Sequence, residues 1–196
     1  MKKIAITLLA LLIIVTFTII NGYNSIQKND ETVSAASSEL LNQYQRRYDL
    51  VPNLINTVKG YSAYESDVLQ NVVKARSAIS QIKVDAQILN DPITAEKYQK
   101  AQDELSASLS RLLAISEQYP DLKASALYQD LMVQLEGSEN RISVARGRYI
   151  EAIGQYNTQL RQFPGFLIAN FMGYKPISHF TLDNKEEIIK TPVVEF

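Results

Sequence analysis

Three charged residues lie at positions where they could form a polar site inside a helical protein. Arg47 falls on an apolar helical stripe, at a position where leucine or valine is expected. Glu139, beside Ser138 on another stripe, is a suitable carboxylate partner, and Arg146 lies on the same side of that helix. An arginine at such a position either extends its aliphatic stem towards solvent or pairs with a carboxylate. The sequence therefore predicts a buried polar network, which either fixes the register of the helices or recognises a ligand or partner.

Catalytic and metal chemistry has few other candidates in this chain. His179 is the single histidine and cysteine is absent, so the usual zinc sites cannot be assembled and no disulfide can form. The sequence contains no Gly-rich phosphate loop, HExxH pair or EF-hand loop. Its scattered Asp and Glu residues are typical of solvated helix faces. We therefore predict no catalytic residue, no cofactor and no metal, in a protein that is not an enzyme.

Long helices must position these charged residues, because glycine and proline are sparse and helix-forming residues dominate. Apolar side chains recur every three or four residues in four segments, which is the spacing of a coiled-coil-like seam. We expect helices over about residues 21–59, 62–89, 92–118 and 121–163. Asp91 and Pro92 mark the start of the third. The short connections favour antiparallel neighbours, so the predicted fold is all-α, an antiparallel four-helix bundle over residues 21–163 with long first and fourth helices.

Local signals mark the first turn between helices. Gly60 is suited to end the first helix in a left-handed conformation, and Ser62 with Glu65 forms a capping box for the second. Pro52 lies inside the first helix, where it removes one backbone donor and is expected to kink the helix about one turn earlier. Asp49 can accept hydrogen bonds from backbone donors that the kink frees. These five residues are predicted to have structural roles.

Residues 4–20 form an uncharged apolar run that directly follows Lys2 and Lys3. Seventeen helical residues span about 26 Å, close to the lower limit for a bilayer core of roughly 30 Å. A basic start suits either a cleaved signal peptide or a retained anchor, but no small-x-small cleavage pattern follows the run, so we expect a transmembrane anchor over residues 1–20. The lysines predict a cytoplasmic amino terminus, a single pass through the cell membrane and a bundle on the extracytoplasmic side.

The charge balance of the remaining chain limits its partners. Removing Lys2 and Lys3 from the 20 basic residues leaves 18 against 21 acidic residues, a net charge of −3. No basic field is available to bind nucleic acid. The predicted partners are therefore the membrane itself and either another envelope protein or a second copy of this chain.

The fourth helix is expected to return towards the membrane, where a second apolar segment follows it. We predict a short helix over residues 164–174, which is too short to span a bilayer. The apolar side chains of this region are Phe163, Phe166, Leu167, Ile168, Phe171 and Met172. They either contact the outer leaflet or fold back to cap the open end of the bundle. Residues 175–196 are predicted to form an irregular tail.

Several sequence runs are long enough to compare with known protein families. They are Arg46-Arg-Tyr-Asp-Leu-Val-Pro-Asn-Leu54, Val58-Lys-Gly-Tyr61 with Glu65, Tyr119-Pro120-Asp-Leu122, Glu139-Asn-Arg-Ile-Ser-Val-Ala-Arg146, Tyr149, Tyr156-Asn157, Phe163-Pro164 and Ile168-Ala169. In this order, over about residues 20–180, they resemble the signature of the LemA family of bacterial membrane proteins. The chain departs from the family at Tyr64-Glu65, where histidine-glutamate is frequent, and at Tyr149-Ile150, where tyrosine-asparagine is frequent.

The resemblance implies a helical bundle on a single amino-terminal membrane helix, with no established enzymatic activity. Family members tend to be encoded near proteins with a TPM-type domain or near membrane metalloproteases, which implies an envelope-associated interaction or scaffold module. The residues themselves leave two alternatives open. One is a bundle that senses or carries a small apolar ligand near Arg47, and the other is a protein that remodels the membrane surface through residues 163–174.

Overall fold

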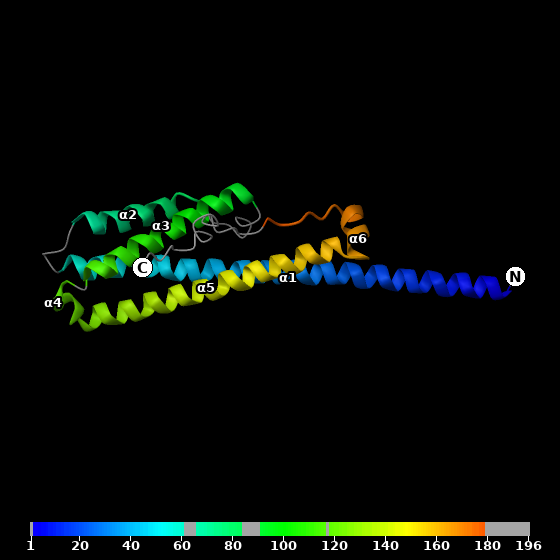
Figure 1. The fold of residues 1–196 in the computed structure, drawn as a ribbon, viewed down its shortest axis with the longest axis horizontal. Helices are drawn as coiled ribbons and strands as arrows, with labels where there is room; N and C mark the ends of the chain where they lie inside the picture. Colours follow the sequence, from blue (N-terminus) through cyan, green and yellow to red (C-terminus); the bar gives the residue numbers. More distant parts are fainter. Residues whose placement is uncertain (1, 61–65, 84–90, 117, 179–196) are drawn as a thin grey trace, which may run out of the picture.

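The computed structural model describes residues 2–60, 66–83, 91–116 and 118–178 of the 196-residue chain. Within these ranges the regular structure is helical and no strand occurs. The helices are α1 (Lys2–Lys59), α2 (Ser66–Ser80), α3 (Pro92–Ser116), α4 (Pro120–Lys123), α5 (Ala126–Arg161) and α6 (Gly165–Met172) (Figure 1). The protein is therefore all-α with a long apolar amino-terminal helix, as the sequence predicts.

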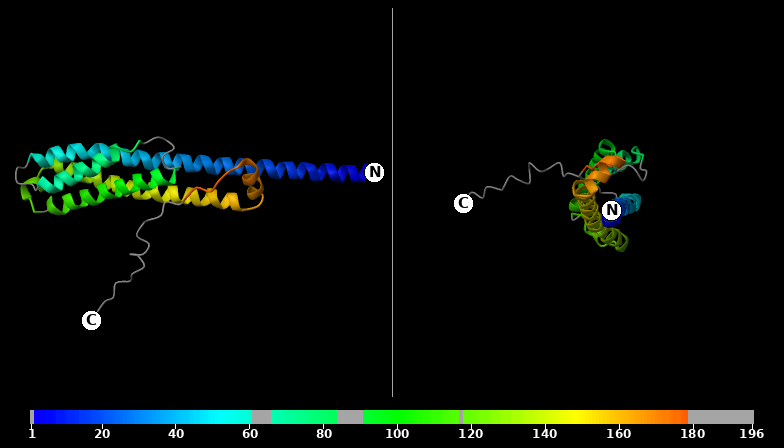
Figure 2. Two further views of the ribbon diagram at one scale, coloured as in Figure 1. Left: turned by 90° about the horizontal axis from the view of Figure 1, so that it is seen from above. Right: turned by 90° about the vertical axis from the view of Figure 1, so that its right-hand side faces the viewer.

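The first helix joins the apolar run to the rest of the molecule. α1 has 58 residues, about 87 Å of helix, and it continues through both residue 20 and Pro52. Its surroundings change at Gly22: the apolar side chains from Ile4 to Ile20 are exposed, whereas Gly22 and Ile26 are buried. The most apolar part of α1 has no buried residue, and this helix is long and apolar enough to cross a membrane. Figure 2 shows its amino-terminal part extending beyond the other helices.

The remaining helices pack in two pairs, α1 with α5 and α2 with α3. Arg47 and Tyr44 of α1 contact Glu139 and Arg146 of α5, respectively. Gly22, much earlier in α1, faces the segment that follows α5. The order of contacts along α5 is thus the reverse of the order along α1, and α2 and α3 cover the half of α1 that is distant from the amino terminus (Figure 1).

The core is a seam of side chains spaced three and four residues apart on each helix. On α1 its apolar members are Ile26, Val33, Leu40, Tyr44, Val51, Leu54, Ile55 and Val58, and on α5 they are Tyr128, Leu131, Leu135, Ile142, Ala145, Tyr149, Ala152, Ile153, Tyr156 and Leu160. Each large aliphatic or aromatic side chain buried in this way contributes about 1.5–3 kcal/mol. Phe163 continues the predicted stripe of α5 but is 79% exposed, because α5 has ended two residues earlier.

The second helix ends before the predicted position, while residues 62–65 and 84–89 of the predicted helix lie outside the described part of the chain. α2 ends at Ser80, whereas the apolar spacing predicts a helix that continues to residue 89. The Ser80 hydroxyl donates to the Ser77 carbonyl at 2.7 Å, and the Ile82 N–H donates to the Ile79 carbonyl at 3.1 Å. These short-range bonds replace the helical ladder and close the helix in a turn.

The predicted fourth helix, residues 121–163, is divided into α4 and α5. Ser125 has an extended backbone (φ −69°, ψ 121°), and its side chain accepts a hydrogen bond from the Tyr128 N–H. Serine in this role begins a new helix by satisfying a free backbone donor. At the other end Gln162 leaves the helical conformation with ψ 152°, so α5 ends at Arg161.

A left-handed glycine ends a helix at Gly173, not at the predicted Gly60. Gly60 lies in a turn, with its N–H donating to the Thr57 carbonyl at 3.3 Å, but its φ is not positive. The left-handed cap predicted there is therefore wrong, because this tighter turn closes α1 without it. Gly173 adopts it instead, with φ 78°, at the end of α6. The cap predicted at Asp91 is confirmed, since its carboxylate accepts from the Thr94 N–H at 3.0 Å.

Candidate functional site

Arg47 is the centre of the buried polar network. Its side chain is 1% exposed, and its guanidinium donates to groups on α3 and α5. One terminal nitrogen bonds the Ser106 hydroxyl and, at 2.5 Å, a carboxylate oxygen of Glu139. The other bonds the Gln102 carbonyl at 3.0 Å and the Gln102 side-chain oxygen at 2.5 Å. The Tyr44 ring lies 5.5 Å from the guanidinium, close enough for a cation–π contact. Arg47 therefore connects α1, α3 and α5 at one level of the molecule.

The two charges of the Arg47–Glu139 pair have unequal access to water. The Glu139 side chain is 44% exposed, so its charge is partly solvated, whereas the arginine depends on its protein partners. The desolvation of a buried charge costs several kcal/mol, which close hydrogen bonds to a counter-ion offset. The Arg47 Nε and the Ser138 hydroxyl are buried without a hydrogen-bond partner among the described residues. The hydrogen bonds of Arg47 thus restrict the positions of the surrounding side chains, although some buried polar atoms have no partner in the described part of the chain.

Arg146 belongs to a neighbouring cluster rather than to the Glu139 pair. It donates to the Tyr44 hydroxyl at 2.8 Å and to the Asp103 carboxylate at 3.0 Å. Burial raises the pKa of Tyr44, although the positive charge of Arg146 opposes this shift. The Tyr44 ring meets Tyr98 edge to face at 5.7 Å, and burial raises the pKa of Tyr98 to about 12. Tyr44, which the sequence places only in the apolar seam, therefore joins the two arginine clusters.

The other residues predicted near the first turn take different positions. Asp49 is exposed and accepts from the Gln45 side chain at 2.8 Å, not from backbone donors near Pro52. This pairing is favourable because the two residues are one helical turn apart. Ser62 and Glu65 lie outside the described residues.

The charged groups of the polar network are paired with other protein groups. In the part of the chain that the structure describes, no three His, Cys, Asp or Glu side chains converge to hold a metal. Arg47 and Arg146 are held by protein groups. The Ser106 hydroxyl lies 3.4 Å from both carboxylate oxygens of Glu139, and Arg47 bonds both of these residues. The arrangement joins α1, α3 and α5 through the hydrogen bonds of Arg47 and Arg146.

A second candidate site lies where α6 packs on α1, just beyond the apolar run. A Cβ atom added to Gly22 would lie 2.6 Å from the Ile168 side chain, so glycine permits the close approach of α6. Ile168 and Ala169 are buried on this side. The side chains on the other sides of α6 and its entry are exposed: Phe163, Phe166, Leu167, Phe171 and Met172. The apolar segment therefore covers the end of the α1–α5 pair with one face and exposes the rest.

Three contacts that sequence reasoning missed hold α6 in place. Tyr174 accepts a hydrogen bond at 2.5 Å from the Gln27 side chain of α1. The Asn157 side chain donates to the Ile177 carbonyl at 2.8 Å and accepts from the Ile177 N–H at 2.9 Å. Residues 173–178 thus run back along the helices. An asparagine at a seam position, where an apolar residue is expected, was the available signal for this attachment.

Comparison with known proteins identifies the family of this chain. The model of the LemA family matches residues 36–196, which is most of the chain. The chain belongs to the LemA family. It is 26% identical to magnetosome protein MamQ of Magnetospirillum gryphiswaldense, over 90% of this chain and 71% of that protein. It is also 26% identical to protein LemA of Metamycoplasma hominis, over 75% of this chain and 63% of that protein.

The motifs that resemble the LemA signature coincide with the contacts of this structure. The run from Arg46 to Leu54 supplies Arg47, and the run from Glu139 to Arg146 supplies the residues that pair with α1 and α3. The motif Tyr156-Asn157 supplies the side chain that binds Ile177. In this LemA-family chain these three motifs therefore supply contacts between helices and between α5 and the segment after α6.

Proposed function

We propose that this LemA-family chain is a non-enzymatic, single-pass membrane protein that serves as an interaction or scaffold module of the cell envelope. Its helices form an antiparallel four-helix bundle on the extracytoplasmic side, and the bundle binds another envelope protein or a second copy of the chain. The observation that carries this proposal is the continuity of α1. One uninterrupted helix includes both the exposed apolar run and the seam of the core, which supports a bundle held close to the membrane by this helix.

The polar network supports a structural role for the interior of the bundle. Arg47 binds three protein side chains and one backbone carbonyl, so the space beside its guanidinium is occupied by protein groups. We assign Arg47, Glu139 and Arg146 to fixing the register of α1, α3 and α5. A ligand carrier would require an accessible cavity beside these groups, and their close pairing favours the scaffold instead.

The sidedness of the proposal can be tested directly because the chain has no cysteine. The variant Asp130→Cys places a single thiol on the exposed surface of α5. We expect a membrane-impermeant maleimide to label it in intact cells with the outer membrane or wall made permeable, to the same extent as in detergent. Labelling that requires disruption of the inner membrane would reverse the proposed orientation. Recovery of the labelled protein without residues 1–20 would contradict the retained anchor.

The partner proposal requires a separate experiment. Crosslinking in living cells through the same exposed thiol is expected to yield one reproducible adduct, either with another envelope protein or with a second copy. A variant with the thiol at Arg148, on another exposed part of α5, serves as a comparison for the preferred face. If neither position gives a reproducible adduct, the chain is not an interaction module.

A contact between α6 and the membrane surface is a further part of the proposal. The exposed apolar side chains of α6 lie beside the point where α1 leaves its apolar run, which is the expected level of the bilayer surface. Since the chain has no tryptophan, Phe171→Trp introduces a single probe at a position that is 89% exposed. We expect brominated phospholipids to quench its fluorescence in vesicles. The control Val133→Trp, 70% exposed on α5, should not be quenched, and equal behaviour of the two probes would contradict the contact.

A further inference from the structure

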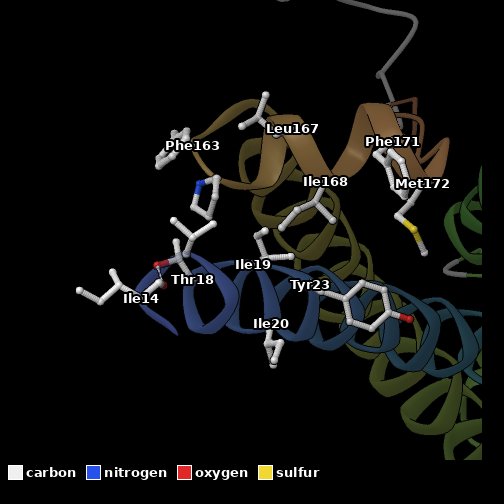
Figure 3. A pocket seen from close by; sticks show the side chains of 12 residues that line it. Ile14, Thr18, Ile19, Ile20, Tyr23, Phe163, Leu167, Ile168, Phe171 and Met172 are labelled. Carbon is white, nitrogen blue, oxygen red and sulfur yellow. Dashed lines mark hydrogen bonds between the residues drawn. The ribbon is translucent and has the colours of Figure 1, made fainter. Parts of the chain in front are cut away.

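An open groove runs between the apolar run of α1 and the helix α6 (Figure 3). Its volume is about 710 Å³, and only Thr18 and Tyr23 among its lining residues have polar side chains. The Thr18 hydroxyl donates to the Ile14 carbonyl at 2.8 Å within α1. Apart from its Tyr23 end, the groove therefore presents hydrocarbon surface without a free polar group, and water inside it would lose hydrogen bonds.

The position of the groove along α1 matches one leaflet of a bilayer. Its α1 wall extends from Ile14 to Tyr23, ten residues whose helical rise from first to last is about 14 Å. Half of a hydrocarbon core of roughly 30 Å is ~15 Å. Ile14 to Ile20 form the carboxy-terminal half of the apolar run, so the groove lies within the leaflet nearest to the bundle. Its surface is continuous with the rest of the exposed apolar surface of α1.

Polar groups gather at only one end of the groove. The Tyr174 hydroxyl accepts from the Gln27 side chain and is also hydrogen-bonded to Tyr23. Burial and the neighbouring Tyr23 raise the pKa of Tyr174. Tyrosine side chains are favoured at the boundary between hydrocarbon and head groups, because the ring is apolar and the hydroxyl is polar. This cluster marks the head-group level, and the opposite end at Ile14 and Phe163 lies deeper.

We propose that the groove holds one acyl chain of a phospholipid from the leaflet nearest to the bundle, an inference that rests on the membrane attachment proposed above. At this depth the groove is surrounded by acyl chains, and leaving it empty would forfeit dispersion contacts on both walls. Ile168, Leu167 and Phe163 on one side and Thr18 and Ile19 on the other contact the chain (Figure 3). The ester region of the lipid lies beside Tyr23 and Tyr174. The bound chain thereby becomes part of the joint between the anchor and α6.

A photoreactive phospholipid tests this proposal with the full chain. The protein is reconstituted into vesicles of phosphatidylethanolamine and phosphatidylglycerol that contain a phosphatidylethanolamine with a diazirine midway along one acyl chain. After illumination, mass spectrometry maps the adducts. We expect adducts on α6 and on the Thr18 side of α1 to exceed those on the Ile13 side several-fold. Leu167→Trp should fill the groove and reduce the α6 adducts several-fold.

Ile13→Trp is the matched control, because Ile13 lies nine residues before Gly22 and about two and a half turns place it on the opposite side of α1. It should leave the α6 adducts unchanged. Equal labelling around α1, or no effect of Leu167→Trp, would overturn the acyl-chain proposal. So would disulfide-linked dimers of a Leu167→Cys variant in place of lipid adducts, because a second copy would then occupy the groove. Quenching of the Phe171→Trp probe that persists in any of these cases leaves the surface contact itself intact.

Discussion

The two ends of the α1–α5–α6 assembly use α1 in different ways. Near Tyr44 and Arg47 the helix meets partners on α3 and α5, and specific hydrogen bonds join Arg47 to Glu139 and Arg146 to Tyr44. Near Gly22 it meets α6 through close apolar contact, and the adjoining surface stays exposed and grooved. The closed polar end, around Arg47, suits a region whose helices keep fixed positions. The open apolar end, around Gly22 and α6, suits a region that contacts lipid acyl chains.

The strongest test of the polar region around Arg47 compares the loss of its counter-ion, Glu139, with the loss of the buried charge itself. Glu139→Ala leaves the positive charge of Arg47 buried without a counter-ion, and we expect a loss of about 3 kcal/mol in unfolding free energy. This is the low end of the range for a broken buried pair, because Glu139 is 44% exposed. Arg47→Met removes the charge and retains much of the volume, so we expect a clearly smaller loss. Chemical denaturation in detergent, followed by circular dichroism, measures both.

Glu136→Ala provides the matched control, since Glu136 is exposed and lies one turn earlier on α5. Its effect should stay within about 0.5 kcal/mol. If Arg47→Met lowers the unfolding free energy as much as Glu139→Ala does, the hydrogen bonds of the arginine stabilise the bundle more than its burial costs. The predicted difference between the two variants is then wrong.

The open end depends on the close approach of backbone at the entry to α6. A Cβ atom added to Gly165 would lie 2.1 Å from the Gln159 carbonyl oxygen, a backbone atom that cannot move without disturbing α5. We expect Gly165→Ala to cost about 1–3 kcal/mol and to move α6, which would decrease the lipid quenching of a tryptophan at Phe171. Gly154→Ala is the control: apart from the nearby backbone of its own helix, no atom lies within 4 Å of the added Cβ, and alanine in a helix should stabilise by about 0.5–1 kcal/mol. Unchanged quenching in Gly165→Ala would show that α6 does not need this contact.

The two ends also differ in how far the sequence reveals them. The apolar run, the seams and the position of Arg47 within a seam follow from residue spacing, because burial on a long helix repeats every three or four residues. The sequence correctly indicates Glu139 as the carboxylate that meets Arg47. It does not indicate Gln102 and Ser106, because partners across a bundle depend on the relative height of helices, which spacing within one helix does not encode.

The boundaries of the helices and the contacts of α6 were harder to predict. The break at Ser125 depends on one capping bond within an otherwise continuous apolar pattern. The end of α2 at Ser80 likewise interrupts a pattern that continues in the sequence. The seating of α6 depends on the absence of side-chain atoms at Gly22 and Gly165, and on the bonds of Asn157 to a backbone segment 20 residues later. Such tertiary contacts leave only a glycine or an asparagine at an unexpected position as a trace in the sequence.

The smallest predicted effect concerns ionisation of the buried tyrosines of the core. Burial raises the pKa of Tyr98 and of Tyr149 to about 12 each, whereas a tyrosine in the unfolded chain titrates near 10. Below pH ~10 both states keep the proton and the neutral side chains contribute their full stability. Between about pH 10 and 12 the unfolded chain releases protons that the folded chain retains, so stability falls as pH rises. A Tyr98→Phe variant has no such proton to lose, and its thermal midpoint should decline a few degrees less than that of the parent over this window. If the two midpoints decline in parallel, Tyr98 ionises as readily in the folded chain as in the unfolded one, and the closed end is more open to water than its packing indicates.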